Sequence, residues 1–303
     1  DVKIGVVPYA DYVNVGTANR NASWLNVPAD YSVTSQRTCV TKNTKSVCTR
    51  GAAKTCTRVV DGISETYDCT PSTCRTETVA PYESCSGGGT THYRWYGCVG
   101  SRTSGSLRLN DTQPSTPYPG YLATSQNCLN PIVPLTASQS TVISAIRGMR
   151  VNIGNYKPLT YIPTGLIWGV NVLSPTAPFS EGAAYDASNR RPRKVMVLMT
   201  DGANTLRLNV SDGRHLAPSG NATNQANQIA QTYSDMAAIC TYAKQQQIEI
   251  FTVAFEITDP VAMSALRNCA TTPGHAFDAK DRQSLADAFK NIALSLTNVR
   301  ITQ

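Results

Sequence analysis

KVMVLMTDG, at residues 194–202, is the stretch of sequence that decides the fold. From Lys194 to Thr200 it is an almost continuous apolar run, which is typical of a strand buried on both faces in a parallel sheet. An acidic residue, Asp201, follows the run directly, and Gly202 lets the backbone turn sharply behind it. The stretch therefore predicts a buried parallel strand with a polar loop at its carboxyl end.

Helices and strands alternate on both sides of this stretch, from about residue 131 to the end of the chain. Five segments have the pattern of helices: 138–150, 165–173, 224–246, 259–269 and 284–297. The first and the last each carry one apolar face, made of Val142, Ile143, Ile146 and Met149 and of Leu285, Phe289, Ile292 and Leu296. Two further strands are expected at 248–255 and 275–278. This alternation predicts an α/β fold with a doubly wound, mainly parallel sheet.

Ligands of such sheets bind in loops beyond the carboxyl ends of the strands. We therefore expect a ligand site at the loops that follow Val7, Thr200 and Phe255. In the second of them, Asp201 could hold a hard cation, although Asp-Gly is also an ordinary turn dipeptide. Thr164 precedes the apolar helix 165–173, where its hydroxyl could cap the helix or coordinate a cation.

The cysteines mark a region of different character. Eight of the ten lie in a Thr- and Ser-rich segment: Cys39, Cys48, Cys56, Cys69, Cys74, Cys85, Cys98 and Cys128. An even count in such a segment predicts disulfides and an oxidising compartment, and eight cysteines allow 105 pairings. A metal cluster is disfavoured because no C-x-x-C occurs and His92 is the segment's one histidine. We expect a small, loop-rich domain of short strands and hairpins, stapled because it cannot build a large apolar core.

Cys240 and Cys269 stand apart from the other eight. They fall in two successive predicted helices and most simply pair with each other, across the strand 248–255. A free reactive thiol is the alternative, but no directly adjacent basic residue supports it.

The chain accordingly divides into three parts. Residues 1–20 hold a strand at Val2–Tyr9, residues 21–130 form the disulfide-rich insertion, and residues 131–303 hold the rest of the α/β domain. Because the chain opens within a strand, we expect a mature, cleaved or truncated product. The insertion's aromatic residues suit either a contact surface or a small core: Tyr93, Trp95, Tyr96, Tyr118 and Tyr121.

Charge and motif content exclude several classes of protein. The net charge of +7 is spread along the chain, and we interpret its densest basic cluster, residues 190–194, as a solvated loop and not as an anion-binding surface. Aromatic residues do not alternate with basic ones, so nucleic-acid binding is not expected. No apolar run approaches the roughly 20 residues of a membrane span. Catalytic signatures such as G-x-S-x-G, H-E-x-x-H and the P-loop are absent, so we expect no enzyme.

The motifs together resemble the von Willebrand factor A (VWA) domain, and in particular that of the TadG-like proteins of tight-adherence (Flp) pilus systems. The resemblance covers residues 1–16 and 131–300. It is carried by VKIGVVPYADYVNV at 2–15, PLT at 158–160, PTGLIWG at 163–169, LSP at 173–175 and VLMTDGANT at 197–205. The opening string looks like the strand that follows the first helix of that family.

The resemblance implies a metal-ion-dependent adhesion site built from three loops. Thr164 matches the second loop and Asp201 the third, but the D-x-S-x-S of the first loop, which ends a central strand, does not occur in this chain. Two oxygen ligands are too few for a stable Mg²⁺ or Ca²⁺ site. We expect the missing strand and helix in the parent protein, with a membrane anchor upstream, or a supply from another polypeptide. In such sites an acidic group of the partner completes the metal.

The implied function is adhesion or protein interaction, without catalysis, in a bacterial pilus or cell-surface assembly. The protein would be periplasmic, surface-bound or extracellular, with pilus or envelope proteins as partners. The VWA scaffold would present the insertion as a recognition surface. One alternative is a structural subunit that self-assembles, with the missing strand donated by a neighbour. Another is a secreted hydrolase with an unrecognised site.

Overall fold

The structure, a computed structural model, describes residues 2–60, 63–112, 115–154, 156–190 and 192–298. It divides into two compact units: Asp1–Pro28 with Trp95–Gln303, and Ala29–Arg94. The sequence placed the borders of the insertion at residues 21 and 130. In the structure, 21–28 and 95–130 belong to the first unit.

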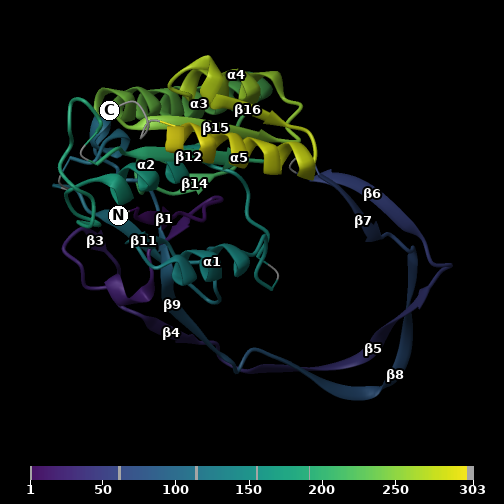
Figure 1. The fold of residues 1–303 in the computed structure, drawn as a ribbon. Helices are drawn as coiled ribbons and strands as arrows, with labels where there is room; N and C mark the ends of the chain where they lie inside the picture. Colours follow the sequence, from purple (N-terminus) through teal and green to yellow (C-terminus); the bar gives the residue numbers. More distant parts are fainter. Residues whose placement is uncertain (1, 61–62, 113–114, 155, 191, 299–303) are drawn as a thin grey trace. The chain divides into compact units, whose positions relative to one another are not determined.

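The centre of the first unit is a three-stranded parallel sheet in the order β12-β15-β16 (Figure 1). Its strands are β12 (Val195–Thr200), β15 (Glu249–Phe255) and β16 (Ala276–Ala279). The quoted stretch forms β12, in register with β15 from the pair Val195 and Glu249 onward. The three strands begin within one residue of the positions that the sequence predicts.

Helices cover both faces of this sheet. On one face, Met196, Leu198 and Ile250 join the main core with α2 (Ile162–Leu173), α3 (Ala222–Gln245) and α4 (Pro260–Cys269). On the other face, Phe251 and Val253 pack with α5 (Arg282–Asn298). Alternate residues of each strand thus face opposite helix layers, which explains the unbroken apolar runs.

The α/β class is confirmed, but the described strands do not form one continuous doubly wound sheet. The predicted N-terminal strand shortens to β1 (Ile4–Val6), which pairs antiparallel with β11 (Val133–Thr136) in a sheet of its own. The helix α1 (Gln139–Arg147) packs against this pair. Of its predicted apolar face, Val142 is buried, whereas Ile146 is 54% exposed.

Short strands from both sides of the insertion form a further sheet of the first unit. Its order is β2-β9-β10-β3, and its strands are β2 (Val13–Asn14), β9 (Thr90–Val99), β10 (Tyr118–Ala123) and β3 (Leu25–Asn26). Its aromatic residues join the core of α2, since Trp24 and Tyr118 both contact Trp168. The smaller elements are η1 (Thr17–Asn19), η2 (Gly105–Leu109), η3 (Pro273–His275), β13 (Arg207–Leu208) and β14 (His215–Leu216).

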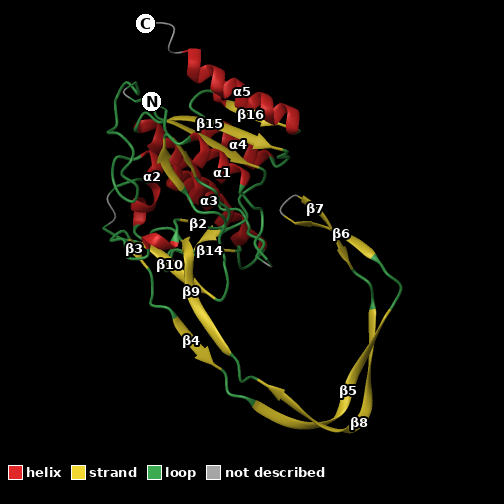
Figure 2. Ribbon diagram, turned by 60° about the horizontal axis from the view of Figure 1, so that its bottom comes forward, coloured by secondary structure: helices red, strands yellow, loops and turns green. Residues whose placement is uncertain are grey.

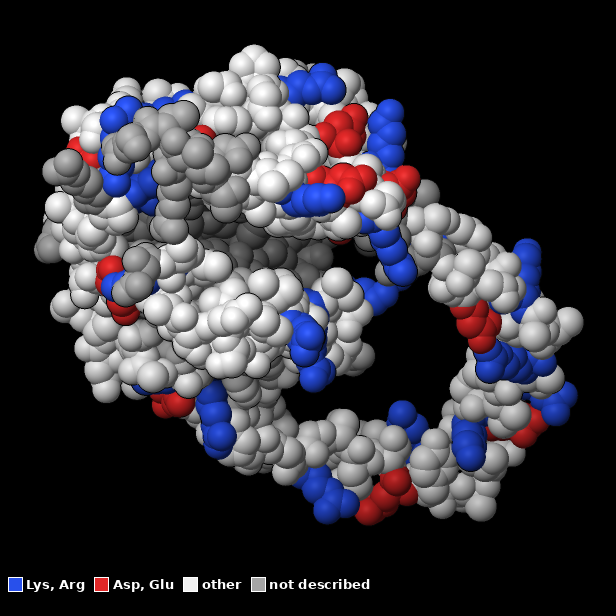
Figure 3. Space-filling view, in the orientation of Figure 1, with Lys and Arg blue, Asp and Glu red and all other residues white. Residues whose placement is uncertain are grey.

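The second unit is a disulfide-linked, two-stranded ribbon (Figure 2). It has the strands and hairpins that the sequence predicts, but they are longer than expected and less of the unit is loop. Its strands are β4 (Tyr31–Thr34), β5 (Thr38–Arg50), β6 (Thr55–Val60), β7 (Ile63–Asp68) and β8 (Ser72–Ser86), and β4 pairs with the start of β9. No residue described in 29–94 is buried. Charges of both signs alternate along the ribbon (Figure 3).

All ten cysteines form disulfides. Three cross-link the ribbon, namely Cys39–Cys85, Cys48–Cys74 and Cys56–Cys69. Two lie in the first unit: Cys98–Cys128 and Cys240–Cys269, the latter being the pairing expected from the sequence. Five disulfides indicate an oxidising environment, extracellular or periplasmic. In the described part of the chain, no helix combines the length and the apolar character needed to cross a bilayer.

The basic cluster before β12 is not a solvated loop throughout. Lys194 is 5% exposed. Its Nζ donates to the carbonyl of Leu173 (2.6 Å) and to that of Ala183, and it lies 4.1 Å from the centre of the Tyr185 ring. These acceptors allow the cation to remain buried, although burial lowers its pKa.

Candidate functional site

Thr164 lies in the first turn of α2 and does not cap the helix, contrary to one of the roles that the sequence suggested. The helix begins two residues earlier, at Ile162, and its N-cap residue Tyr161 makes no side-chain cap bond. The amide of Ile162 instead donates to Oδ1 of Asn204 (2.8 Å). Asn204 therefore caps α2 from the loop that follows β12, a role that no local sequence pattern could show.

The structure ties the loop of Asp201 to the loop that precedes α2. The amide of Thr205 donates to the carbonyl of Thr160 (3.0 Å), and the amide of Thr160 donates to Oγ1 of Thr205 (3.0 Å). Together with the Asn204 cap, these bonds hold residues 160–164 against residues 200–205. The two segments that the sequence singled out thus meet at the carboxyl end of β12.

The hydroxyl of Thr164 is a buried polar group without a partner. The residue is 1% exposed, and its Oγ1 makes no hydrogen bond in the described structure. Nδ2 of Asn204 is likewise buried and unpartnered. Such atoms are costly unless something satisfies them. The Thr164 oxygen can ligate a cation, whereas Nδ2 of Asn204 is a donor and needs an acceptor.

Asp201 is exposed at the tip of its loop. The preceding Thr200 shapes the turn, because its Oγ1 accepts from the amide of Gly202 (3.3 Å) and lies 3.1 Å from the carbonyl oxygen of Gly202. The Asp201 carboxylate is therefore presented to solvent from a short, hydrogen-bonded turn.

Tyr9 contacts β12 and α2, the two elements that adjoin these loops. Its hydroxyl donates to the carbonyl of Met199 (2.9 Å), two residues before Asp201. Its ring lies against Gly165, where an added Cβ would come within 2.6 Å of ring atoms. Burial raises the pKa of Tyr9 far above its ordinary value, so the hydroxyl keeps its proton and remains a donor at neutral pH.

The oxygen donors of Thr164 and Asp201 fit Mg²⁺ or Ca²⁺ in kind but not in number, since these ions take six or more ligands. The orphaned Thr164 hydroxyl is the direct sign of such a fit. Elsewhere in the described chain, Cys39, Glu83 and Cys85 lie close enough together to hold a metal. Both cysteines are disulfide-bonded, so that cluster is not a metal site.

A second polar cluster, which the sequence did not reveal, surrounds His215. Its Nδ1 faces the carbonyl of Asp11 and must carry the ring proton, so its Nε2 accepts from the hydroxyl of Ser101 (2.9 Å). The ring is stacked between Tyr12 and Tyr161, at 5.0 and 3.9 Å. Ser101 and His215 are 8% and 4% exposed, so the pair lies in the packed interior of the first unit.

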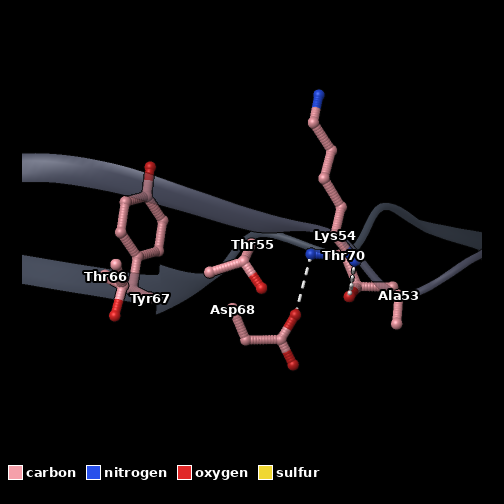
Figure 4. Close-up of a pocket in the computed structure, with 7 residues that line it drawn as sticks. All are labelled: Ala53, Lys54, Thr55, Thr66, Tyr67, Asp68 and Thr70. Atoms are coloured by element: carbon pink, nitrogen blue, oxygen red, sulfur yellow. Dashed lines mark hydrogen bonds between the residues drawn. The ribbon is translucent and has the colours of Figure 1, made fainter.

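Two surface hollows lie away from these clusters. One, of about 280 Å³, lies in the ribbon and is lined by Ala53, Lys54, Thr55, Thr66, Tyr67, Asp68 and Thr70 (Figure 4). Its polar groups serve the local turns, since the amide of Thr70 donates to Asp68 and that of Lys54 donates to Thr70. The other, of about 370 Å³, is lined by residues that include Tyr96, Asn130 and Arg150.

Comparison with known families gives one match. A family model described as the von Willebrand factor type A domain matches residues 120–291, which is more than half of the chain. The matched region begins in β10 and includes α2, β12 and the loop of Asp201. No curated protein and no solved structure matches the chain.

Proposed function

The chain belongs to the von Willebrand factor type A domain family, and from this we propose that it is a non-enzymatic interaction protein of a bacterial pilus or similar cell-surface assembly. Domains of this family are generally protein-interaction and adhesion modules. The disulfides agree with a periplasmic or extracellular place of action. The TadG-like strings quoted above support the assignment to a pilus system.

The observation that carries the proposal is the orphaned hydroxyl of Thr164 beside the loop of Asp201. We propose that these two residues hold Mg²⁺ or Ca²⁺ through oxygen atoms. The cation would offer an open coordination position to a carboxylate of the partner protein. Its chemistry there is recognition, because the described site presents no general base and no nucleophile beside these ligands.

The remaining ligands would come from a further strand that carries D-x-S-x-S. The free edge of β12 supports this part of the proposal. In the described chain, β12 pairs with β15 alone and β1 with β11 alone. Both strands lie on α2, through Gly169 against Met196 and through Gly5 against Val172. Val197, in the middle of β12, is 38% exposed, and an apolar edge of this kind is a template for another strand.

Cation titration tests the site. Calorimetry with Ca²⁺ or Mg²⁺ is done on the chain alone and with a synthetic apolar strand peptide that ends in D-x-S-x-S. We expect the peptide to strengthen cation binding, and we expect Thr164→Ala and Asp201→Ala each to abolish that gain. Asp287→Asn, at an exposed carboxylate on α5, is the matched control and should change nothing. Equal binding by all four proteins would refute the assignment.

The same free edge favours a second candidate, a subunit that polymerises by donating a strand to its neighbour. Light scattering coupled to size exclusion separates the two proposals. A molar mass that grows with protein concentration would favour the polymer, provided that Val197→Lys at the β12 edge abolishes this growth. A monodisperse monomer at all concentrations would favour the interaction module.

A further inference from the structure

Tyr9 occupies the junction of three elements of the first unit. Two residues separate it from the end of β1. Its ring lies against Gly165 in the first turn of α2, and its hydroxyl donates to the carbonyl of Met199 near the end of β12. Residues 9 and 199 are 190 positions apart in the sequence. A single side chain therefore joins the segments that carry Thr164 and Asp201.

The Met199 carbonyl is available to Tyr9 because of the direction in which it points. In a parallel strand, the N–H and C=O of successive residues point alternately to the two edges. The amide of Glu249 in β15 donates to the carbonyl of Lys194. Residues 196, 198 and 200 therefore also address β15, whereas 195, 197 and 199 address the free edge. Met199 is the last of these before Asp201.

We propose that Tyr9 is a positioning residue for the cation site of the previous section, on which this inference rests. Its hydroxyl fixes the end of β12 and hence the start of the Asp201 turn. Its ring, pressed on Gly165, fixes the first turn of α2 and hence Thr164. Gly165 is part of the same device, because any side chain there would displace the ring.

The test compares Tyr9→Phe with Tyr121→Phe. Both changes keep the ring and remove a hydroxyl that donates to a backbone carbonyl, that of Met199 (2.9 Å) in one case and that of Asp212 (2.7 Å) in the other. Amide hydrogen exchange of residues 200–206 measures the order of the Asp201 loop without any cation. Titration with Tb³⁺, a Ca²⁺ surrogate, in the presence of the strand peptide measures the site itself.

We expect Tyr9→Phe to speed exchange in residues 200–206 and to weaken Tb³⁺ binding, each by roughly three- to tenfold, as the loss of one hydrogen bond implies. Tyr121→Phe should leave the exchange of residues 200–206 and the Tb³⁺ affinity unchanged. It should do so even if it lowers the Tm as much as Tyr9→Phe does, or more. Unchanged loop exchange in Tyr9→Phe would overturn the inference. A different outcome is faster exchange in Tyr9→Phe together with Tb³⁺ binding that is unchanged by Thr164→Ala and by Asp201→Ala. It would refute the cation site but keep the role of Tyr9 in positioning the loop.

Discussion

At the scale of single residues, two buried groups of the first unit titrate in opposite senses. Burial lowers the pKa of His215 to about 4, because the ring is enclosed between aromatic residues. Burial raises the pKa of Asp11 to about 6, in spite of the hydrogen bond that its carboxylate accepts from Tyr156. The two residues are in contact, through the carbonyl of Asp11.

These shifts predict opposing effects on stability. His215 stabilises the fold above its unfolded pKa near 6.5, and this contribution, roughly 3 kcal/mol, is lost as the pH falls through about 4. Asp11 stabilises the fold below 3.8, and its contribution is lost as the pH rises through about 6. Denaturant unfolding of the wild type should therefore give a free energy that changes little between pH 4 and 6.

Single variants should separate the two slopes. Asp11→Asn, which keeps the oxygen acceptor, should leave a free energy of unfolding that rises with pH from 4 to 6.5. His215→Gln should leave one that falls from pH 4 to 6. Parallel curves for all three proteins would show that neither group is perturbed. Asp287→Asn, at an exposed carboxylate on α5, serves as the control and should preserve the flat profile.

At the scale of elements, the sequence predicted what local periodicity encodes. The runs predicted at 194–200 and 248–255 form the strands β12 and β15. Ser138 and Asp259, predicted as the first residues of two helices, are the N-caps of α1 and α4. It misplaced the start of α2, because the cap of that helix is Asn204, from a loop some forty residues later. For the ribbon the sequence predicted only short strands and hairpins without bounds, because its strands have no buried face and so no apolar alternation.

The ribbon's strands depend on their disulfides, and this gives a prediction. A two-stranded hairpin is marginal by itself. The ribbon cysteines are exposed or half-buried, whereas the other four are at most 2% exposed. Under mild native reduction we expect alkylation of Cys39, Cys48, Cys56, Cys69, Cys74 and Cys85 well before the remaining four.

Mass spectrometry of the alkylated protein checks the order of reduction. Far-UV circular dichroism at that stage should show loss of strand with the helices intact. The double variant Cys48→Ser/Cys74→Ser should speed amide exchange along β5 and β8 and leave the exchange of α3 unchanged. Early labelling of Cys240 or Cys269 would contradict the prediction.

At the scale of the whole molecule, long-range pairing decided what the sequence could not show. Thr164 and Asp201 could be predicted as candidates because each stands beside a recognisable element and matches the family resemblance. Tyr9 and the pair of Ser101 and His215 were not, because their partners are 190 and 114 positions away and no local pattern records such contacts. The second compact unit, 29–94, is smaller than the insertion predicted at 21–130. From the sequence, Trp95 and Tyr118 were assigned to the insertion, as a contact surface or a small core of its own. In the structure they are buried in the core around Trp168.

The two units should therefore differ in what they contribute to stability. No residue described in the ribbon is buried, and the residues from the insertion that fill the core, such as Trp24 and Trp95, lie outside 29–94. Replacing residues 35–89 by Asn-Gly keeps the cross-strand pair Thr34 and Thr90 and supplies a two-residue hairpin turn. Calorimetry should show a Tm within about 4 °C of the intact protein, equivalent to about 1 kcal/mol.

A substitution in the core of the first unit gives the Tm change against which that of the shortened protein is compared. Trp24 is 7% exposed and contacts Trp168 and Phe179, so Trp24→Ala should cost about 3–5 kcal/mol. The shortened protein should still bind the cation through Thr164 and Asp201 but should lose partners that recognise the ribbon. A fall in Tm as large as that of Trp24→Ala would show that the ribbon stabilises the first unit. If the shortened protein still binds its partner, the partner is recognised by the loops around Asp201 and not by the ribbon.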